Sequence, residues 1–392
     1  MGGNSVKTAD FIIVGAGVMG ASIAFSLAKR KVGRIVVLEK EHIGRGGSGR
    51  SSALIRMHYS FPPEVRLAVK SLEIFQNWKE IVGEPGGFRK IGFARLVPNN
   101  ELHLLKANVA MLQECGANTR LISLAELREM EPDWNLEDEP AAAYEPDGGY
   151  GDGAIAALDL MSAARERGVD YRPRTQVIGM LLNGSGIHGV VTAEGIFEAP
   201  IVVLATGPWT RPLLRPIGVD LPIDTEFHQV AILRNPPELK ASGSACIDSC
   251  NTVYFRSDAH DKTLLGDFYG QRGLDADNFP QRTSDDWLEK ILEQACHRIP
   301  KLQNAEVMRG ITGIYDMSPD SRPLLGEVSQ VPRLYVAAGF SGMGFKISPA
   351  VGLVMAELIL DGAGKTVDIS AFRPSRFEEG QPIKAEFEYQ DD

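Results

Sequence analysis

The chain has 392 residues, of which 44% are hydrophobic and 23% charged, as is typical of a folded globular protein of about two domains. Its formal net charge of −10 argues against nonspecific binding to nucleic acid, which requires an excess of Lys and Arg. The four cysteines and seven histidines form no cluster with the spacing of metal ligands. We therefore expect free thiols, a reducing cytoplasmic compartment and no bound metal.

The first predicted elements are a strand, a glycine turn, a helix and a second strand, within residues 10–39. In the turn, Gly15 permits the tight bend, Gly17 lets the backbone approach a pyrophosphate, and Gly20 lets the helix pack on the strand. Glu39 follows at the spacing of an acid that binds both ribose hydroxyls. The pattern favours dinucleotide binding over a membrane span; the alternative is a glycine-rich turn in an ordinary βαβ unit.

Small residues fill the next segment, between Arg45 and Arg56. Glycines permit close backbone approach, and hydroxyl and N–H groups bind oxygen atoms, so we expect part of a ligand site here rather than a flexible surface loop. The candidate cofactor-binding residues of this segment are Gly47, Ser48, Arg50, Ser51 and Ser52.

The remaining pattern predicts alternating helices and strands. Expected helices cover residues 65–82, 102–115, 123–130, 158–167, 284–298 and 348–360. Expected strands cover residues 92–97, 170–172, 175–182, 188–192, 199–204, 228–233, 252–256, 263–266 and 333–338.

Segments with the features of a cofactor domain recur at 11–59, 147–210 and 333–360, so we expect two discontinuous domains. The cofactor domain is predicted to comprise residues 1–86, 147–215 and 316–373, and the substrate domain residues 87–146 and 216–315. Residues 374–392 are acidic and weakly apolar, and we expect a disordered tail.

With the opening motif, the segments 46–56, 205–207 and 339–346 make the chain resemble the D-amino-acid-oxidase superfamily of FAD enzymes. Within it, residues 9–373 are similar to the sarcosine oxidase and glycine oxidase branch, including sarcosine oxidase β-subunits. The resemblance implies a Rossmann-like α/β FAD-binding domain and an α+β substrate domain built on an antiparallel sheet. It also implies oxidation of the C–N bond of a small primary or secondary amino acid to an imine, with O2 or another electron acceptor and, in some relatives, a partner subunit.

The resemblance also implies roles for individual residues. Arg56 matches an arginine that binds the substrate carboxylate, and Lys346 its lysine partner. Tyr315 and Tyr254 match aromatic residues of the substrate cavity, and His58 lies in the same motif as Arg56. The alternatives are a phosphate contact or surface ion pair for Arg56, a helix-face lysine for Lys346, and core packing for the tyrosines. The further candidate cofactor-binding residues are Ala16, Val18, Met19, Lys40, Val177, Ala205, Thr206, Gly207, Trp209, Gly339, Gly342, Met343, Gly344 and Phe345.

Three departures from the family pattern refine these expectations. Gly313 replaces the cysteine that links FAD covalently in some relatives, so we expect non-covalent FAD. Residues 149–156 lack the histidine that attaches a second flavin in β-subunits of multi-subunit relatives. Leu264 stands where monomeric oxidases place a lysine that activates O2, and Lys262 is expected to point away.

These departures leave two alternatives to an amino acid oxidase. The first is a dehydrogenase subunit that passes electrons to a dye, a quinone or a partner protein. The second is an assembly factor that retains FAD without turnover, which a carboxylate-binding pair at Arg56 and Lys346 disfavours.

Overall fold

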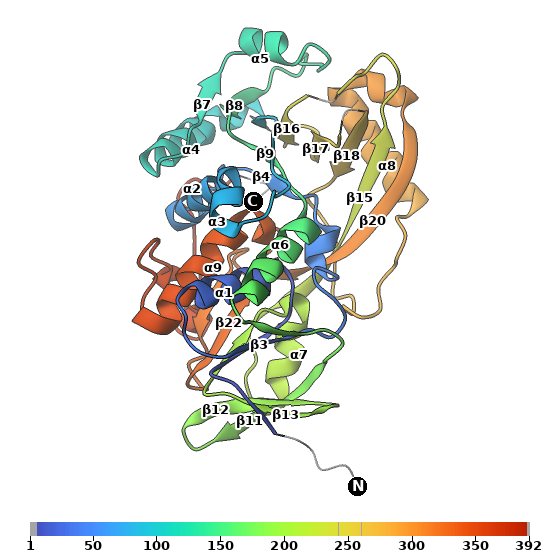
Figure 1. Cartoon of the computed structure of the whole chain (residues 1–392). Coiled ribbons are helices and arrows are strands. Elements are labelled where there is room, and N and C mark those ends of the chain that lie inside the picture. Colours follow the sequence, from blue (N-terminus) through green and yellow to red (C-terminus); the bar gives the residue numbers. More distant parts are fainter. Residues whose placement is uncertain (1–5, 242, 260, 390–392) are drawn as a thin grey trace.

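A six-stranded sheet forms the centre of one half of the molecule (Figure 1). The computed structural model describes residues 6–241, 243–259 and 261–389. Neighbouring strands of this sheet run parallel except for the last pair, which is antiparallel. Its strands are, in spatial order, β10 (Asp170–Arg172), β3 (Ile35–Leu38), β2 (Phe11–Val14), β14 (Ile201–Leu204), β22 (Leu334–Ala338) and β21 (Leu324–Glu327).

Both faces of this sheet are covered, which explains why its strands are apolar along their whole length. Successive side chains of a strand point to opposite faces. Ile13 accordingly packs among helices, whereas Ile12 packs toward a four-stranded sheet. The helices and the smaller sheet lie on opposite sides in Figure 1. The smaller sheet contains β1 (Lys7–Thr8), β13 (Gly195–Glu198), β12 (Gly186–Thr192) and β11 (Val177–Asn183).

Helices complete this half and cover part of the other. Those packed together over the six-stranded sheet are α1 (Val18–Lys29), α2 (Pro62–Gln76), α6 (Gly153–Glu166) and α9 (Gly344–Asp361). The others are α3 (Trp78–Val82), α4 (Leu102–Glu114), α5 (Leu124–Met130), α7 (Thr210–Leu214) and α8 (Asp285–Arg298). Across the described ranges, we find no helix with the length and apolar character that crossing a membrane requires.

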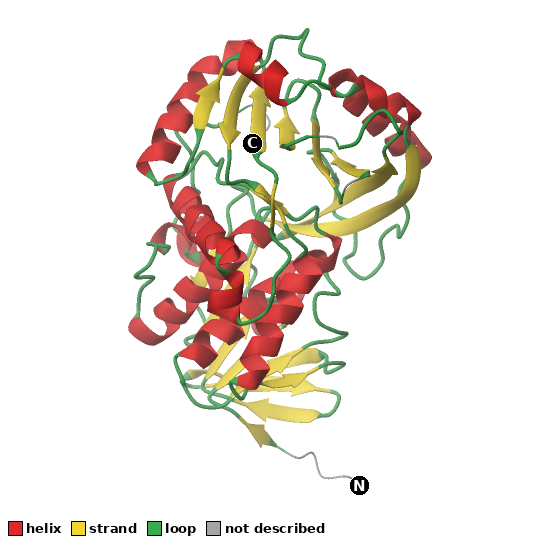
Figure 2. Cartoon of the chain, turned by 45° about the horizontal axis from the view of Figure 1, so that its top comes forward, coloured by secondary structure: helices red, strands yellow, loops and turns green. Residues whose placement is uncertain are grey.

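A nine-stranded sheet dominates the second half (Figure 2). Its pairs are antiparallel, as expected, except that β16 runs parallel to β6. Its strands are β19 (Gln271–Arg272), β15 (Asp224–Arg234), β18 (Lys262–Gly266), β17 (Val253–Ser257), β16 (Ala245–Asp248), β6 (Phe93–Val97), β8 (Ala141–Glu145) and β7 (Arg120–Ile122), with β20 (Glu306–Met317) paired to β15. The positions of the domain boundaries remain predictions.

The two faces of this sheet bury different clusters. Phe255 and Leu265 pack with α8, whereas Tyr254 and Leu264 belong to a separate cluster on the opposite face. Because strand residues two apart share a face, Lys262 lies on the same face as Leu264, about 7 Å along β18. The expectation that Lys262 points away was therefore wrong.

A short third sheet links the two halves next to Arg56. Its strands are β4 (Leu54–Ile55), β9 (Gly149–Tyr150) and β5 (Arg89–Lys90). Arg56 follows β4 directly, so the backbone pairing of β4 with β9 sets where the Arg56 segment begins.

Most expected elements are present, but several helices differ in their limits. Helix α9 begins at Gly344 rather than 348, and α2 begins at Pro62 rather than 65. The expected helix 65–82 is divided into α2 and α3 at Asn77, whose φ of −113° and ψ of 31° are not helical. Helix α6 begins at Gly153 rather than 158, because the side chain of Asp152 caps it by accepting from the backbone N–H groups of Ala154 and Ile155. The serine caps of α5 and α8, at Ser123 and Ser284, are as expected.

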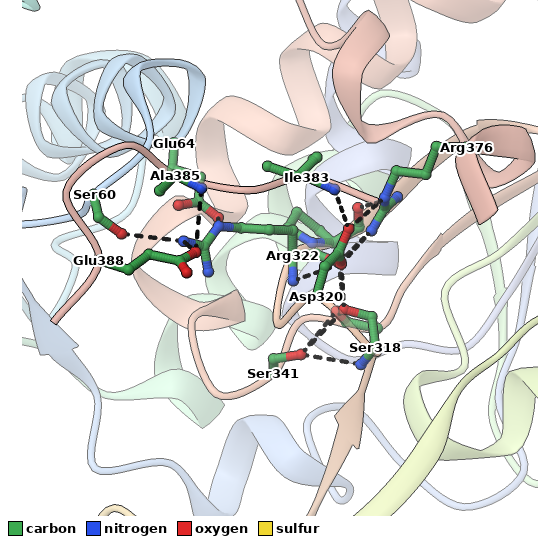
Figure 3. Close-up of polar contacts among 12 residues, drawn as sticks. Ser60, Glu64, Ser318, Asp320, Arg322, Ser341, Arg376, Ile383, Ala385 and Glu388 are labelled. Atoms are coloured by element: carbon green, nitrogen blue, oxygen red, sulfur yellow. Dashed lines mark hydrogen bonds and ion pairs between the residues drawn. The ribbon is translucent and has the colours of Figure 1, made fainter. Parts of the chain in front are cut away.

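The expectation of a disordered tail was wrong for residues 374–389. The Arg376 side chain is fully buried and forms an ion pair with Asp320 at 2.8 Å (Figure 3). Tyr389 is also buried. Composition alone favours disorder here because the segment has few apolar residues. A buried ion pair and one buried aromatic ring hold it against the rest of the chain instead.

Candidate active site

The glycine turn after β2 forms the floor of the cofactor cavity. Gly15 has a φ of +100°, and a Cβ there would lie 2.4 Å from the backbone oxygen of Ala205. A Cβ on Gly20 would lie 1.9 Å from the backbone oxygen of Gly15, so α1 packs against the turn only with glycine at this position. The turn therefore needs both glycines, and it directs the N-terminus of α1 toward the cavity.

Two backbone groups hold the side chain of Glu39, the residue expected to bind a ribose. Its Oε2 accepts from the N–H of Ala16 at 2.8 Å, and its Oε1 accepts from the N–H of Glu41 at 2.8 Å. Each carboxylate oxygen retains capacity for a further hydrogen bond. This orientation suits a ligand with two neighbouring hydroxyl groups.

A cavity of about 860 Å³ has both Glu39 and Tyr315 in its lining. The predicted cofactor residues that line it are Gly15, Gly17, Val18, Met19, Glu39, Lys40, Gly47, Ser48, Arg50, Ser51, Val177, Ala205, Thr206, Gly207, Trp209, Gly342, Gly344 and Phe345. The predicted cofactor residues outside its lining are Ala16, Gly20, Ser52, Gly339, Met343 and Lys346. Ala16 and Gly20 support the turn from behind, as described above, so their role is in packing and in holding Glu39.

One side of this cavity comes from a loop that the sequence analysis did not identify. Residues 276–279 and Gln281 line the cavity, although they follow strands of the nine-stranded sheet. The Asp277 carboxylate lies 2.6 Å from Lys40 Nζ and accepts from Trp209 Nε1 at 3.0 Å. Lys40 Nζ is also 3.7 Å from the centre of the Trp209 ring. Nothing in the local sequence predicts this contact, because its partners are more than sixty residues apart.

The residues present fit the FAD molecule that the resemblance implies. The residues that line the cavity include the acid Glu39, glycine backbone, the Ser48 hydroxyl and aromatic side chains such as Tyr315. At Gly17 a Cβ would lie 3.1 Å from Ser48 Oγ, so a larger residue would narrow the cavity where phosphates are expected. Ser48 Oγ accepts from the N–H of Val18 at 2.9 Å, which fixes the hydroxyl at the helix N-terminus.

Gly313 leads to a prediction about how the flavin is held. A glycine offers no thiol for a covalent link, and a Cβ at this position would already lie 3.3 Å from Cβ of Arg50. Acid or heat should therefore release one FAD per chain into the supernatant, measured by its absorbance. Flavin that remains with the precipitated protein would contradict this prediction.

Arg56 and Lys346 lie near each other beyond the lining of this cavity. The Arg56 guanidinium carbon is 4.3 Å from the centre of the Tyr59 ring and 5.9 Å from that of Phe93. Its Nε is buried without a hydrogen-bond partner among the described residues.

Lys346 is 9% exposed, and its Nζ is 3.4 Å from the backbone oxygen of Gly342. Burial, and then the charge of Arg56, lowers the pKa of Lys346 well below its ordinary value. An anion bound between the two groups would favour the charged form of Lys346 and would pair with Arg56.

Of the two predicted tyrosines, which lie on β20 and β17 of the nine-stranded sheet, Tyr315 lines the cavity and Tyr254 does not. Tyr315 also stacks on His228 with 4.0 Å between ring centres, and His228 Nε2 lies 2.9 Å from Glu226 Oε1. Burial raises the pKa of Tyr315 to about 12 and that of Tyr254 well above its ordinary value. Both phenols therefore keep their protons at neutral pH.

His58 has a different environment from the one expected for a site residue. It is buried, does not line the cavity, and its Nε2 lies 2.8 Å from the hydroxyl of Tyr389. Its Nδ1 is 3.9 Å from Oε1 of Glu145. Burial, followed by the charges of Arg95 and Arg56, lowers the pKa of His58 well below its ordinary value. A neutral histidine behind Arg56 is thus better suited to supporting the site than to contacting a ligand.

Comparisons with known proteins agree with this arrangement. The model of the family described as FAD dependent oxidoreductase matches residues 10–358. Glycine oxidase of Geobacillus kaustophilus (strain HTA426) is 29% identical over 362 residues, covering 89% of this chain and 92% of that protein. Sarcosine oxidase subunit beta of Rhizobium meliloti (strain 1021) is 27% identical over 382 residues, covering 95% and 89%. The crystal structure of L-proline dehydrogenase from P. horikoshii has a TM-score of 0.89 at 29% identity, covering 97% of this chain and 100% of that one.

Proposed function

This chain belongs to the FAD-dependent oxidoreductase family, and we propose that it oxidises the C–N bond of a small primary or secondary (N-alkyl) amino acid. The product would be an imine, which water hydrolyses to a carbonyl compound and an amine. When bound, FAD accepts the two electrons and the hydrogen that leave the substrate. The observation that carries the proposal is the buried guanidinium of Arg56, whose Nε has no hydrogen-bond partner among the described residues, with the Lys346 amine nearby.

The groups around this pair have complementary tasks. Arg56 would bind both carboxylate oxygens through its planar guanidinium, and Lys346 would add a point charge. Phe93, Tyr254 and Leu264 form part of one apolar cluster, which would exclude water from the substrate. The hydroxyl oxygens of Tyr254 and Tyr315 could accept an N–H of the amine, since both phenols stay protonated at neutral pH.

An anaerobic titration tests the proposed function. Sarcosine, glycine and proline are added to the protein, and loss of the absorbance of oxidised flavin is recorded. We expect at least one of them to reduce the flavin. Dimethylamine and pyrrolidine, which lack the carboxylate of sarcosine and proline, are the matched controls and should reduce it far less. No reduction by any amino acid, or equal reduction by the controls, would contradict the proposal and favour a non-catalytic FAD protein.

A dehydrogenase that uses another electron acceptor is the second candidate. A cation above the flavin favours electron transfer to O2 by stabilising the negative charge that develops. Leu264 supplies no charge and is buried in an apolar cluster, and Lys262 lies about 7 Å further along the same face. The similarity to an L-proline dehydrogenase supports this candidate as well.

Stopped-flow mixing of the substrate-reduced protein with oxygenated buffer separates the two candidates. We expect reoxidation slower than turnover with a dye or quinone, because Leu264 stands where monomeric oxidases place the lysine that would activate O2 beside a bound flavin. Reoxidation as fast as turnover would instead make the protein an oxidase. In that case Lys262→Ala should slow the reaction if Lys262 supplies the charge, and Lys346→Ala if Lys346 does.

A further inference from the structure

The last described segment of the chain ends in a buried position behind Arg56. Residues 383–389 extend from the network around Asp320 toward the first turn of α2, and Figure 3 shows Ile383, Ala385 and Glu388 along this path. The segment ends at Tyr389, which is 5% exposed. The proposed reaction gives no role to this segment.

Tyr389 makes three kinds of contact in its pocket. Its hydroxyl lies 2.8 Å from His58 Nε2, and the two rings stack with 5.8 Å between their centres. The guanidinium carbon of Arg95 is 4.6 Å from the centre of the Tyr389 ring. The ring also packs in an apolar cluster with Val97 and Leu105 of the second half of the molecule. One side chain therefore connects His58 to the nine-stranded sheet and α4.

Neighbouring contacts fix the path of this segment. The backbone oxygen of Phe387 accepts from Asn108 Nδ2 at 2.8 Å. Glu388 Oε1 lies 3.2 Å from Nη2 of Arg322, whose Nε is 3.1 Å from Oε1 of Glu64 on α2. These contacts of Phe387 and Glu388 thus hold the chain directly before Tyr389, which reduces its freedom to move away from His58.

The backbone around Arg56 depends on contacts from behind. The N–H of Met57 donates to Oε2 of Glu145 at 2.8 Å, and His58 is held by Tyr389. The guanidinium of Arg56 itself lies against the Tyr59 and Phe93 rings. Such cation–π contacts do not fix the direction of its N–H groups. The direction of the Arg56 guanidinium therefore depends on its backbone, and one of the contacts that support this segment, that of His58 with Tyr389, comes from the last described residues.

We propose that Tyr389 is a positioning residue for carboxylate binding: it holds His58, and through it the Arg56 segment, in the geometry that the substrate carboxylate requires. This inference rests on the proposed function of Arg56. It assigns a role in substrate specificity to the C-terminal segment. A shift of the Arg56 guanidinium by about 1 Å would weaken the binding of carboxylates but not of the flavin.

Acetate binding, followed by the change it causes in the absorbance of the protein-bound flavin, is the direct test. Tyr389→Phe keeps the ring and removes the bond to His58, so we expect acetate affinity to fall roughly three- to tenfold. Flavin content and melting temperature should stay close to those of the wild type. Glu386→Gln, at an exposed position of the same segment, is the matched control and should leave acetate affinity unchanged.

Two further variants separate positioning from a purely structural role. Tyr389→Ala should weaken acetate binding more than Tyr389→Phe does. If Tyr389 acts through His58, then adding Tyr389→Phe to His58→Phe should cause little further loss, because the two changes remove the same hydrogen bond. A lower melting temperature with unchanged acetate affinity in both Tyr389 variants would overturn the proposal.

Arg56→Ala distinguishes this failure from failure of the proposed function. If Arg56→Ala binds acetate as well as the wild type, Arg56 does not bind carboxylates, and both inferences fail. If Arg56→Ala loses acetate binding and the Tyr389 variants keep it, only the positioning role fails. The readout needs no turnover, so it holds whichever amino acid the protein oxidises.

Discussion

Replacing Arg56 by alanine should weaken the affinity for a carboxylate-bearing substrate by roughly 2–4 kcal/mol, the usual loss for one side of a desolvated, charge-assisted contact. The buried Nε of Arg56 has no hydrogen-bond partner among the described residues, and a bound carboxylate would supply one. The loss should appear in kcat/KM for the amino acid that reduces the flavin.

Comparison with Lys346 sharpens this prediction. Lys346→Ala should cost less, because an ammonium group lacks bidentate geometry and because burial already disfavours its charged form. Arg66→Ala removes an exposed arginine from α2 and is the control for a general change of charge. Steady-state kinetics that Arg56→Ala leaves unchanged would place carboxylate binding elsewhere and remove the main support for the proposed substrate class.

Arg376→Ala should lower the free energy of unfolding by roughly 3–5 kcal/mol, because it leaves a buried carboxylate without its cation. Arg376 is fully buried, donates from Nε and Nη2 to the two oxygens of Asp320 at 2.9 and 2.8 Å, and also donates to the backbone oxygen of Pro323 at 3.0 Å (Figure 3). Chemical unfolding, followed by circular dichroism, measures this loss.

Arg373→Ala is the matched control, three residues earlier in the chain. Its ion pair with Glu379 is partly exposed, at 38% for both side chains, and such pairs contribute less than about 1 kcal/mol. Equal losses for the two variants would show that burial of the Arg376 pair contributes nothing. If the C-terminal segment detaches without global unfolding, limited proteolysis should cleave it in Arg376→Ala and not in Arg373→Ala.

The sequence predicted the cofactor half of the fold because its signals are local. A strand, a turn that needs glycine at Gly15 and Gly20, a helix and an acid at Glu39 lie within thirty residues, and each is set by backbone geometry at its own position. The serine caps at Ser123 and Ser284 were predictable for the same reason. Arg56 and Lys346 were identified through the family resemblance, since neither is marked by its neighbours in sequence.

Only the tertiary structure decided how distant segments complete the site. Asp277 reaches Lys40 from the other half of the molecule, and Tyr389 reaches His58 from the end of the chain, at separations of 237 and 331 residues. The segment after Arg373 lacks the apolar residues that predict order, and distant partners such as Asp320 and His58 hold it in place. The sequence by itself thus determined the cofactor-binding turn and the chemistry available to the site, because these depend on neighbouring residues. Which side chains close the cavity and support Arg56 depended on long-range packing, which no local pattern encodes.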